Sequence, residues 1–449
     1  MKCAAVILAA GKGTRMKSRL PKVLHPILGR PMAQYAIDAV KQVVDQPPIM
    51  VVGHEAHEVQ NRLGKQVQYV IQEEQLGTGH AVQQAEPAVD ETCQLVLITN
   101  ADMPLVRSET LEKLIETQRN HQGPMTMLTL EVDDPRGFGR VIRGGDGSVQ
   151  AIVEEADATQ EQLDVNELNA AMYCIRNDWL WSHLPEIDLS AKGEYYLTDL
   201  VEIATAEGET VQAVRVSDPD ELIGINNRVH LAQAARTLRL RINQEWMLSG
   251  VTITDPQRTY IEPGVTLGQD AVILPNTHLK GETSIGEGAT IGPDTTVVDS
   301  RVAKGCQVES STIEESTLEE GVDIGPYSHL RRGARLGPGV HIGNYCEIKD
   351  STLGEGTKMG HFSYLGNAQI GKRVNIGAGT ITCNYDGKQK HVTTIEDGVF
   401  IGSDTMLVAP VRVGQGARTG AGSVVTKDVP PRSLAVGVPA RVIRKQGKS

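Results

Sequence analysis

Residues 261–297 read IEPGVTLGQDAVILPNTHLKGETSIGEGATIGPDTTV. An aliphatic residue returns at every sixth position of this stretch, an interval too long for one face of a helix or a strand. These register residues are Ile261, Leu267, Ile273, Leu279, Ile285, Ile291 and Val297. The period describes a repeating unit of backbone, with an aliphatic side chain buried at each bend, often beside a Gly that tolerates close backbone approach. The stretch therefore predicts a solenoid of short flat sides wound round a narrow core.

The same register continues beyond residue 297, with interruptions. Six-residue steps resume over residues 318–348 and again over 395–413, and several steps elsewhere shorten to five. The largest interruption lies between Ile381 and Ile395, where the segment TCNYDGKQKHVTT is inserted. Insertions in a solenoid emerge as loops, often on the binding face, so this segment is a candidate site.

Composition limits the classes of protein that fit. At 449 residues the chain is long enough for two or three domains, and its net charge of −12 argues against general nucleic-acid binding. No apolar run is long enough to span a bilayer, so we expect a soluble protein without membrane insertion. Six cysteines are scattered without a C-x-x-C pair, which argues against a structural zinc site or a disulfide framework and fits the reducing cytoplasm.

The first half of the chain has a different pattern. Short aliphatic runs at 3–10, 49–53, 67–72 and 95–100 alternate with helical stretches such as the one that follows Pro31, as in a parallel α/β sheet. Apolar residues at helical spacing over 228–247 predict a long amphipathic helix before the repeats. The expected domains are an α/β domain over 1–227, a helical linker over 228–250 and the repeat domain over 251–449.

The opening segment is basic and contains a glycine loop. No acidic residue precedes Asp38, and the predicted first strand runs into GKGTRM at residues 11–16. Glycines at the end of a parallel strand let backbone N–H groups face an anion, and Arg15 and Lys22 add positive charge. The loop is not a Rossmann fingerprint, because Met16 replaces the third Gly, and it lacks the G-K-[ST] of a Walker A loop.

Longer strings carry a more specific resemblance. LAAGKGTRM at 8–16, LPKVL at 20–24 and EEQLGTGHA at 73–81, together with the hexapeptides, resemble the bacterial bifunctional N-acetylglucosamine-1-phosphate uridylyltransferase/glucosamine-1-phosphate acetyltransferase family. The resemblance implies a Rossmann-like nucleotidyltransferase domain, joined by a long helix to a left-handed parallel β-helix that assembles as a homotrimer. It also implies acetylation of glucosamine-1-phosphate by acetyl-CoA, followed by uridylyl transfer from UTP to N-acetylglucosamine-1-phosphate.

The resemblance assigns roles in the first half of the chain. Uridylyl transfer crowds negative charge at the α-phosphorus of UTP, so catalysis depends on positioning and charge neutralisation. Arg15 and Lys22 would bind phosphates, while Asp102 and Asn226 would hold Mg²⁺. The implied UDP-sugar-binding residues are Leu8, Ala9, Gly11, Lys22, Gln72, Gly77, Thr78, Asp102, Gly139, Glu154, Asn169 and Asn226.

Two short segments depart from the family pattern. The chain has Asn100-Ala101-Asp102 where the family usually has an aromatic residue, Gly and Asp. It has Ala170-Ala171 after Asn169, where Thr-Gly is usual. Both segments are expected near the sugar or metal pocket.

The second implied site lies in the repeats. His361, which follows Met359 and Gly360, would take a proton from the 2-amino group of the sugar, a task suited to the ordinary pKa of His. By resemblance, the sugar phosphate and sugar would be bound by Arg331, Lys349, Tyr364 and Asn375, and acetyl-CoA by Ala378, Asn384, Tyr385, Ser403 and Ala421. The family's arginine for the CoA phosphate has no clear counterpart among Arg441, Arg444 and Lys445.

Three alternatives remain open from sequence. The chain could be a single-function sugar-nucleotide pyrophosphorylase whose β-helix is structural or regulatory. A trimeric β-helix zinc site is disfavoured, because His329, His341, His361 and His391 lack the close spacing that such a site uses. Cys383 as a nucleophile is also disfavoured, because no His is placed to activate it.

Overall fold

The computed structural model describes residues 1–53, 55–132 and 137–445. The chain forms two compact units, Met1–Leu238 and Arg239–Ser449, and each is described by itself. Among the described residues, no helix is both long and apolar enough to cross a membrane.

The first unit is built on a mixed sheet with strand order β11-β7-β10-β6-β1-β4-β5, and β8 and β9 pair at its side. The strands of this unit, including the β2–β3 hairpin, are β1 (Cys3–Ala9), β2 (Pro26–Ile27), β3 (Arg30–Pro31), β4 (Ile49–Val52), β5 (Gln68–Ile71), β6 (Leu95–Asn100), β7 (Met125–Glu131), β8 (Arg140–Arg143), β9 (Val149–Val153), β10 (Glu167–Arg176) and β11 (Val211–Arg215). The four strands predicted from aliphatic runs correspond to β1, β4, β5 and β6, which pair in parallel.

The predicted parallel sheet also contains antiparallel pairs, and in its centre these involve β10. This strand lies between β6 and β7 and is antiparallel to both. Its sequence, ELNAAMYCIR, is almost continuously buried, as in any central strand, and burial does not encode strand direction. The carboxyl ends of β1, β4, β5 and β6 nevertheless share one edge, and the predicted first site lies there.

Helices cover both faces of this sheet. The α-helices are α1 (Met32–Lys41), α2 (Ala56–Leu63), α3 (Thr78–Gln83), α4 (Ser108–Asn120), α5 (Gln160–Leu163), α6 (Asn177–His183), α7 (Leu200–Ala206) and α8 (Arg228–Leu248). Single 3₁₀ turns are η1 (Thr14–Met16), η2 (Lys22–Leu24), η3 (Glu86–Ala88), η4 (Leu184–Glu186), η5 (Leu197–Asp199), η6 (Pro219–Leu222) and η7 (Pro256–Arg258). The helix predicted after Pro31 is α1, which ends at Lys41.

Helix α8 contributes to both units. Leu231, Ala235 and Leu238 pack against a buried cluster of the first unit. Further along the helix, Ile242 and Trp246 pack against the core of the second unit. The boundary between the compact units therefore lies inside the segment predicted as a linker, and each half of α8 is anchored by its own apolar contacts.

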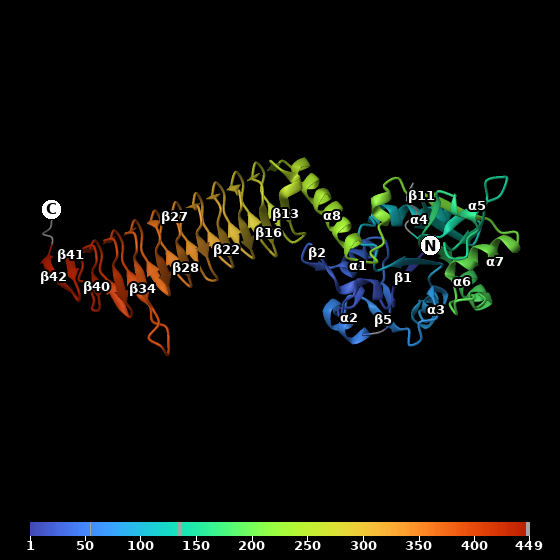
Figure 1. Ribbon diagram of the computed structural model, residues 1–449, viewed down its shortest axis with the longest axis horizontal. Coiled ribbons are helices and arrows are strands. Elements are labelled where there is room, and N and C mark those ends of the chain that lie inside the picture. Colours follow the sequence, from blue (N-terminus) through green and yellow to red (C-terminus); the bar gives the residue numbers. More distant parts are fainter. Residues whose placement is uncertain (54, 133–136, 446–449) are drawn as a thin grey trace. The chain divides into compact units, whose positions relative to one another are not determined.

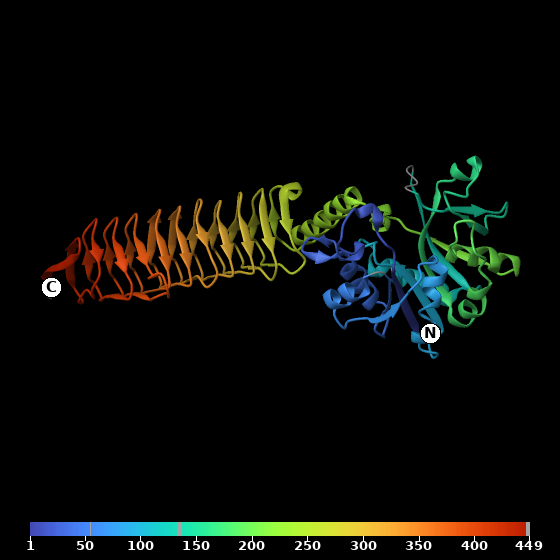
Figure 2. The same cartoon turned by 60° about the horizontal axis from the view of Figure 1, so that its bottom comes forward.

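The second unit is a parallel β-helix of three stacked sheets (Figures 1 and 2). The first sheet contains β12 (Thr252–Ile253), β15 (Val272–Ile273), β18 (Thr290–Ile291), β21 (Gln307–Val308), β24 (Asp323–Ile324), β27 (His341–Asn344), β30 (Lys358–His361), β33 (Asn375–Ile376), β36 (Phe400–Ile401), β39 (Arg418–Thr419), β41 (Ser433–Gly437) and β42 (Ala440–Lys445). The second contains β13 (Thr259–Ile261), β16 (Thr277–Lys280), β19 (Thr296–Val298), β22 (Thr312–Glu314), β25 (His329–Leu330), β28 (Glu347–Lys349), β31 (Tyr364–Gly366), β34 (Ile381–Cys383), β37 (Met406–Val408) and β40 (Val424–Val425). The third contains β14 (Thr266–Leu267), β17 (Ser284–Ile285), β20 (Arg301–Val302), β23 (Thr317–Leu318), β26 (Arg335–Leu336), β29 (Thr352–Leu353), β32 (Ala368–Ile370), β35 (Thr393–Ile395) and β38 (Val411–Val413).

The six-residue register corresponds to the buried core of this β-helix. Ile261, Ile273 and Leu279 are fully buried, and Leu267 packs against the same cluster. Each coil places one register residue on each of the three sheets. Successive coils pair in parallel, which buries a continuous aliphatic column and confirms the prediction drawn from the period.

The five-residue steps have a local explanation. Asp299, Ser310 and Glu315 occupy three such steps with φ of 46°, 42° and 43°. A buried serine follows each of them, and its hydroxyl donates to a carbonyl two residues back, as Ser300 does to Val298 over 2.7 Å. Six-residue steps also contain left-handed residues, such as Asp270 and Asn276, but these lie three residues after the register residue instead of two. In the five-residue steps the left-handed residue comes one position earlier, and the serine satisfies the carbonyl at the bend.

The insertion after Ile381 emerges as a loop, as predicted (Figure 1). Tyr385 and Lys390 form an antiparallel bridge across it, and His391 Nε2 lies 2.7 Å from Asp386 Oδ2. The chain then re-enters the coils at β35. The loop is therefore a hairpin closed by its own contacts.

Ala171, one of the departures noted from sequence, is a strained position on β10. Its φ is 53°, a conformation that disfavours a Cβ by about 1 kcal/mol. We expect Ala171→Gly to raise the unfolding free energy of the first unit by about 0.5–1 kcal/mol, measured by denaturant titration. Ala170→Gly is the matched control, because Ala170 is buried without a positive φ and should lose stability; equal effects of the two changes would contradict the argument.

Candidate functional site

Four predicted residues meet at the carboxyl edge of the first unit's sheet. Lys22 Nζ contacts Asp102 Oδ2 in an ion pair and also donates to Asn226 Oδ1 over 3.1 Å. Arg15 Nη2 donates to the same Asn226 oxygen over 3.0 Å. The structure thus brings two cations and the two predicted metal ligands into one cluster.

Backbone contacts hold this cluster in place. Ala101 N–H donates to Leu8 O over 3.0 Å, which fixes the residue before Asp102 against the end of β1. Ile225 N–H donates to Asp102 O over 2.9 Å, which brings Asn226 alongside. Gly13 has a φ of 59°, and a Cβ there would lie 2.6 Å from Lys22 Cβ, so glycine is needed for the loop to approach Lys22.

The oxygen atoms of this cluster fit a divalent cation. Asp102 Oδ2 and Asn226 Oδ1 both contact the single Lys22 ammonium, so the two oxygens converge on one cationic position. Mg²⁺ typically takes one or two protein oxygens, with the remaining positions filled by water and substrate phosphates. Asp102 and Asn226 can therefore hold such an ion together with a nucleotide, if Lys22 turns toward the phosphates.

Gln72, one of the predicted UDP-sugar-binding residues, is buried just beyond β5. Its Nε2 lies 3.1 Å from Gly77 O and 3.0 Å from His80 Nδ1. These two acceptors direct the amide nitrogen inward and leave the amide oxygen for a ligand. His80 lies in the recognised string EEQLGTGHA but was not singled out from sequence, because its contact with Gln72 depends on the fold.

Gly77 and Thr78 lie next to Gln72 and bring the start of α3 close to the segment 195–197. Gly77 has a φ of 102°, and a Cβ there would lie 2.5 Å from Tyr195 O. The Thr78 hydroxyl accepts from Leu197 N–H over 3.0 Å, so it is already engaged within the protein. Both residues thus attach the start of α3 to the 195–197 segment.

The predicted sugar residues are adjacent. Asn169 N–H donates to Gly139 O over 2.9 Å, and a Cβ on Gly139 would lie 3.6 Å from Glu154 Oε1. Burial raises the pKa of Glu154, whose Oε1 lies 3.5 Å from the Thr198 hydroxyl. Burial, with nearby carboxylates, also raises the pKa of Asp199 to about 6. The sequence interpretation missed Thr198 and Asp199, because EYYLTD at 194–199 matches no motif that was recognised.

The two sequence departures in the first unit contact one another. Asn100 Nδ2 donates to Ala171 O over 2.8 Å. Asn169 Oδ1 accepts from Ala171 N–H over 3.0 Å, and Asn169 Nδ2 donates to the buried Tyr173 hydroxyl over 2.7 Å. Asn100 and Asn169 therefore hold both sides of the strained peptide at Ala171 beside the predicted sugar residues.

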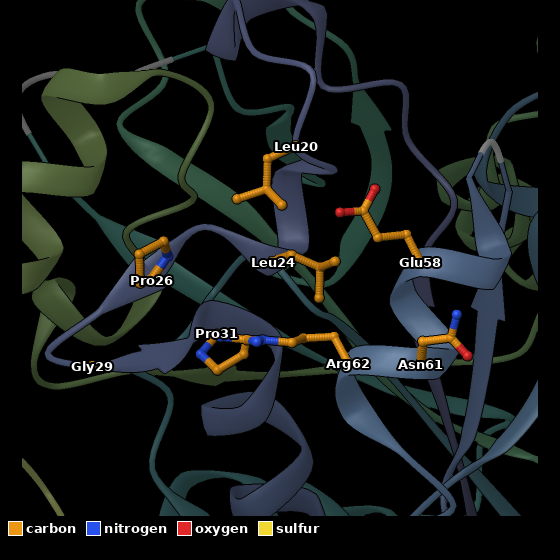
Figure 3. A pocket seen from close by; sticks show the side chains of 8 residues that line it. All are labelled: Leu20, Leu24, Pro26, Gly29, Pro31, Glu58, Asn61 and Arg62. Carbon is orange, nitrogen blue, oxygen red and sulfur yellow. The ribbon is translucent and has the colours of Figure 1, made fainter. Parts of the chain in front are cut away.

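A separate cavity of about 500 Å³ lies by the loop that carries Lys22 (Figure 3). It is lined by Leu20, Leu24, Pro26, Gly29, Pro31, Glu58, Asn61 and Arg62. None of the predicted site residues lines it, so it is not assigned a role in the chemistry.

In the second unit, His361 begins a column of turn residues along one edge of the β-helix. It pairs in register with Asn344, and its Nδ1 lies 3.4 Å from Asn344 Oδ1. On the following coils, Ala378 O accepts from Asp404 N–H over 2.7 Å, and Ser403 O accepts from Gly422 N–H over 2.8 Å. The catalytic candidate and the predicted CoA residues Ala378, Ser403 and Ala421 thus lie on the same edge.

A groove of about 620 Å³ follows the end of this column. It is lined by Phe400, Gly402, Ser403, Arg418, Thr419, Gly420, Ala421 and Leu434. A Cβ on Gly402 would lie 2.7 Å from the carbonyl carbon of Gly420, so the small residues allow close packing of the turns and leave the outer space open.

Comparisons with known proteins match both halves of the chain. The MobA-like NTP transferase domain family matches residues 5–144, and the bacterial transferase hexapeptide family matches residues 393–427. The bifunctional protein GlmU of Halalkalibacterium halodurans is 45% identical over 433 residues, which cover 96% of this chain and 95% of that protein. GlmU of Heliobacterium modesticaldum is 48% identical over 433 residues, which cover 96% of this chain and 94% of that protein.

The chain belongs to the GlmU family. GlmU of Pelobacter propionicus agrees, at 46% identity over 446 residues, 98% of this chain and 97% of that protein. A solved UDP-glucose pyrophosphorylase complexed with UDP-glucose aligns with 53% of this chain and 98% of its own, at 18% identity and a TM-score of 0.45. Like its GlmU relatives, this chain is bifunctional, with N-acetylglucosamine-1-phosphate uridylyltransferase and glucosamine-1-phosphate acetyltransferase activities.

Of the residues predicted to bind the sugar phosphate in this GlmU chain, Lys349 lies on the second sheet and Arg331 directly follows its strand β25. Arg331 Nη1 donates to Glu347 Oε1 over 2.8 Å, and Lys349 pairs in register with Gly366. The nearby charge of Lys390, followed by that of Arg331, lowers the pKa of Lys349. Like charges are thus concentrated at one place, as an anion site requires. Lys390 was missed, because only the folded hairpin brings it to Lys349.

The four other predicted substrate and CoA residues, Tyr364, Asn375, Asn384 and Tyr385, do not all lie together. A Cβ on Gly366 would lie 2.7 Å from Asn384 Nδ2 and would also contact the Tyr364 hydroxyl, so both polar groups point to Gly366. Asn384 is buried and donates to Asn367 Oδ1 over 2.7 Å, whereas Tyr385 is 61% exposed. Asn375 lies apart from them, on the first sheet.

The four histidines considered for zinc make separate contacts. His329 lies 3.1 Å from Glu314 Oε2, His341 lies 2.7 Å from Asp323 Oδ2, and His391 bonds to Asp386 in the hairpin. His361 contacts Asn344 instead of a carboxylate. Across residues 1–53, 55–132 and 137–443, no group of three or more His, Cys, Asp or Glu side chains is placed to hold a metal ion.

Proposed function

We propose that residues 1–227 transfer the uridylyl group and that residues 251–449 transfer the acetyl group, each through the clusters described above. The convergence of Lys22, Asp102 and Asn226 supports the first assignment. The edge shared by His361, Ala378 and Ser403 supports the second. Leu8 and Ala9 end β1 and Gly11 follows it, so these implied UDP-sugar ligands lie at the carboxyl end of that strand.

In the proposed uridylyl transfer, the phosphate oxygen of N-acetylglucosamine-1-phosphate attacks the α-phosphorus of UTP. The new P–O bond forms as the bond to pyrophosphate breaks. Arg15 and Lys22 neutralise the charge on the phosphates, and Gln72 presents its amide oxygen to the uracil N3–H. Mg²⁺ held by Asp102 and Asn226 would supply further charge neutralisation at the phosphates. Glu154 and Asn169 face the sugar.

In the proposed acetyl transfer, Arg331, Lys349 and Lys390 bind the phosphate of glucosamine-1-phosphate. His361 takes a proton from the amine while the nitrogen attacks the thioester carbonyl. The C–S bond then breaks, and the CoA thiolate leaves and takes up a proton. Tyr364 lies on the second sheet, on the strand that pairs with the one carrying Lys349, where it can contact the sugar. Burial raises the pKa of Cys383, which disfavours a thiolate nucleophile there.

We also propose that the β-helix assembles as a trimer. Tyr327 and Tyr345 occupy successive coils beside the His361 edge, with ring centroids 5.5 Å apart, and they are 61% and 62% exposed. Phe362, on the next coil, is 58% exposed. An exposed row of three aromatic rings is typical of an interface. Both tyrosines have left-handed φ values of 61° and 57°, which bulky residues rarely adopt without a specific role.

A charged substitution in this aromatic row tests whether the row forms the trimer interface. Tyr345→Asp is expected to shift the full-length protein from trimer to monomer, because trimer formation would bury an unpaired carboxylate. The mass of the particle is measured by light scattering after gel filtration. Val442→Asp is the control, because Val442 is an exposed apolar residue outside the row. A Tyr345→Asp trimer as stable as the original would remove this face from the interface.

Two assays on the full-length chain test the functional assignment. The first supplies N-acetylglucosamine-1-phosphate, UTP and Mg²⁺ and measures pyrophosphate. The second supplies glucosamine-1-phosphate and acetyl-CoA and measures free thiol. Pyrophosphate without thiol would favour the alternative of a single-function pyrophosphorylase with a structural β-helix, whereas absence of pyrophosphate would overturn the first assignment.

We place both reactions in the cytoplasm. The six cysteines are free, and five of them are buried. Unpaired thiols of this kind are usual where glutathione and thioredoxin maintain reducing conditions.

A further inference from the structure

The groove lined by the predicted CoA residues Ser403 and Ala421 is also lined by an arginine, Arg418. Arg418 lies on β39, and its guanidinium carbon is 4.9 Å from the centroid of the Phe400 ring on the neighbouring strand. Within the part of the chain whose side chains are described, Arg418 makes no ion pair. The aromatic face therefore positions the side chain while its hydrogen-bond donors stay available.

The position of Arg418 fits the phosphate end of a long ligand. It lines the 620 Å³ groove together with Ser403 and Ala421. Strand β39 is three strands from β30 in the first sheet, so at the usual strand spacing it is about 14 Å along the stack from the strand that carries His361. Acetyl-CoA has its thioester at one end of the pantetheine arm and its phosphates at the other, so one molecule can reach both places.

We propose that Arg418 binds a phosphate of acetyl-CoA, a role that the sequence did not assign to any residue. This inference rests on the proposed acetyl transfer. A guanidinium on an aromatic face offers two parallel N–H donors to a phosphate, which is the geometry that phosphate recognition favours. Phe400 is 41% exposed and supplies an apolar surface beside the same groove.

Steady-state kinetics of the full-length protein test the proposal. We expect Arg418→Ala to raise KM for acetyl-CoA by about 10- to 50-fold, the loss typical of one charged hydrogen bond, with kcat unchanged. Arg418→Lys keeps the positive charge but replaces the forked guanidinium with an ammonium group. Its KM for acetyl-CoA should lie between that of the unmodified protein and that of Arg418→Ala. Arg301→Ala is the matched control, because Arg301 is an exposed strand arginine on the third sheet without an ion pair among the described residues.

Acetyl-dephospho-CoA distinguishes the two phosphate groups of the ligand. If Arg418 meets the 3′-phosphate, Arg418→Ala will not change KM for the dephospho substrate. If it meets the diphosphate, KM will rise equally for both substrates. An unchanged KM for acetyl-CoA in Arg418→Ala, or a rise seen in Arg441→Ala instead, would overturn the proposal. Absence of acetyl transfer in the unmodified protein would instead mean that the proposed function itself fails.

Discussion

His361→Ala is expected to lower kcat for acetyl transfer by about 10²–10⁴-fold, the usual contribution of a general base. The amine must lose a proton as it attacks the thioester, and His361 is the group proposed to accept that proton. KM for both substrates should change little, because the phosphate-binding arginine and lysines remain. The measurement is the rate of thiol release with glucosamine-1-phosphate and acetyl-CoA.

Two controls separate this role from a structural one. His341→Ala removes another histidine from the first sheet, paired with Asp323, and should leave kcat near the original value. The uridylyl transfer of His361→Ala should also be unchanged, because the first unit has its own core. Unchanged acetyl transfer in His361→Ala would show that His361 is not the general base.

Lys22→Ala should produce the second large effect, a fall of about 10²–10³-fold in kcat for uridylyl transfer. Lys22 supplies positive charge where the α-phosphorus is attacked, and it touches both predicted metal ligands. Lys22→Arg should recover part of the rate, because it restores the charge with a different geometry. Pyrophosphate release at saturating Mg²⁺ measures the effect.

The matched control for Lys22 is Lys41→Ala. Lys41 is an exposed lysine at the end of α1, so this variant loses the same charge away from the cluster. It should keep the original rate. A similar fall in both variants would show that net charge, and not the position of Lys22, matters. Acetyl transfer by Lys22→Ala should be unaffected, which also checks that the chain is folded.

The β-helix could be predicted closely because its period is a property of one short unit. Each register residue faces the same core, so an aliphatic side chain recurs whatever lies on the outer faces. The interruptions could be located too, since the hairpin after Ile381 breaks the register. The aromatic row was harder to recognise. Tyr327, Tyr345 and Phe362 are 18 and 17 residues apart, an alignment that becomes evident only when the length of each coil is known.

In the first unit, the positions of several strands could be predicted from sequence, but the direction of every strand could not. Aliphatic runs located β1 and β6, but the direction of β10 depends on the path of the chain between strands, which local pattern does not encode. Lys22 could be named because it lies in a recognisable string, and Asp102 because it follows a recognisable strand. Asp199 could not be named, because its raised pKa arises from burial and from carboxylates that folding brings near it.

At Ala171, only part of the structural feature could be predicted from sequence. The departure from the family pattern was visible in the sequence, whereas its physical cost was not. The structure shows a left-handed residue held by Asn100 and Asn169. The alanine is therefore strained where glycine would not be.

The most direct test is to supply glucosamine-1-phosphate, acetyl-CoA, UTP and Mg²⁺ together to the full-length protein and identify the products, and then to omit each substrate in turn. We expect UDP-N-acetylglucosamine, pyrophosphate and free CoA from the complete mixture. Without UTP, N-acetylglucosamine-1-phosphate should accumulate, and without acetyl-CoA no N-acetylated UDP-sugar should form. A complete mixture that yields UDP-glucosamine and leaves acetyl-CoA intact would contradict the two-step account.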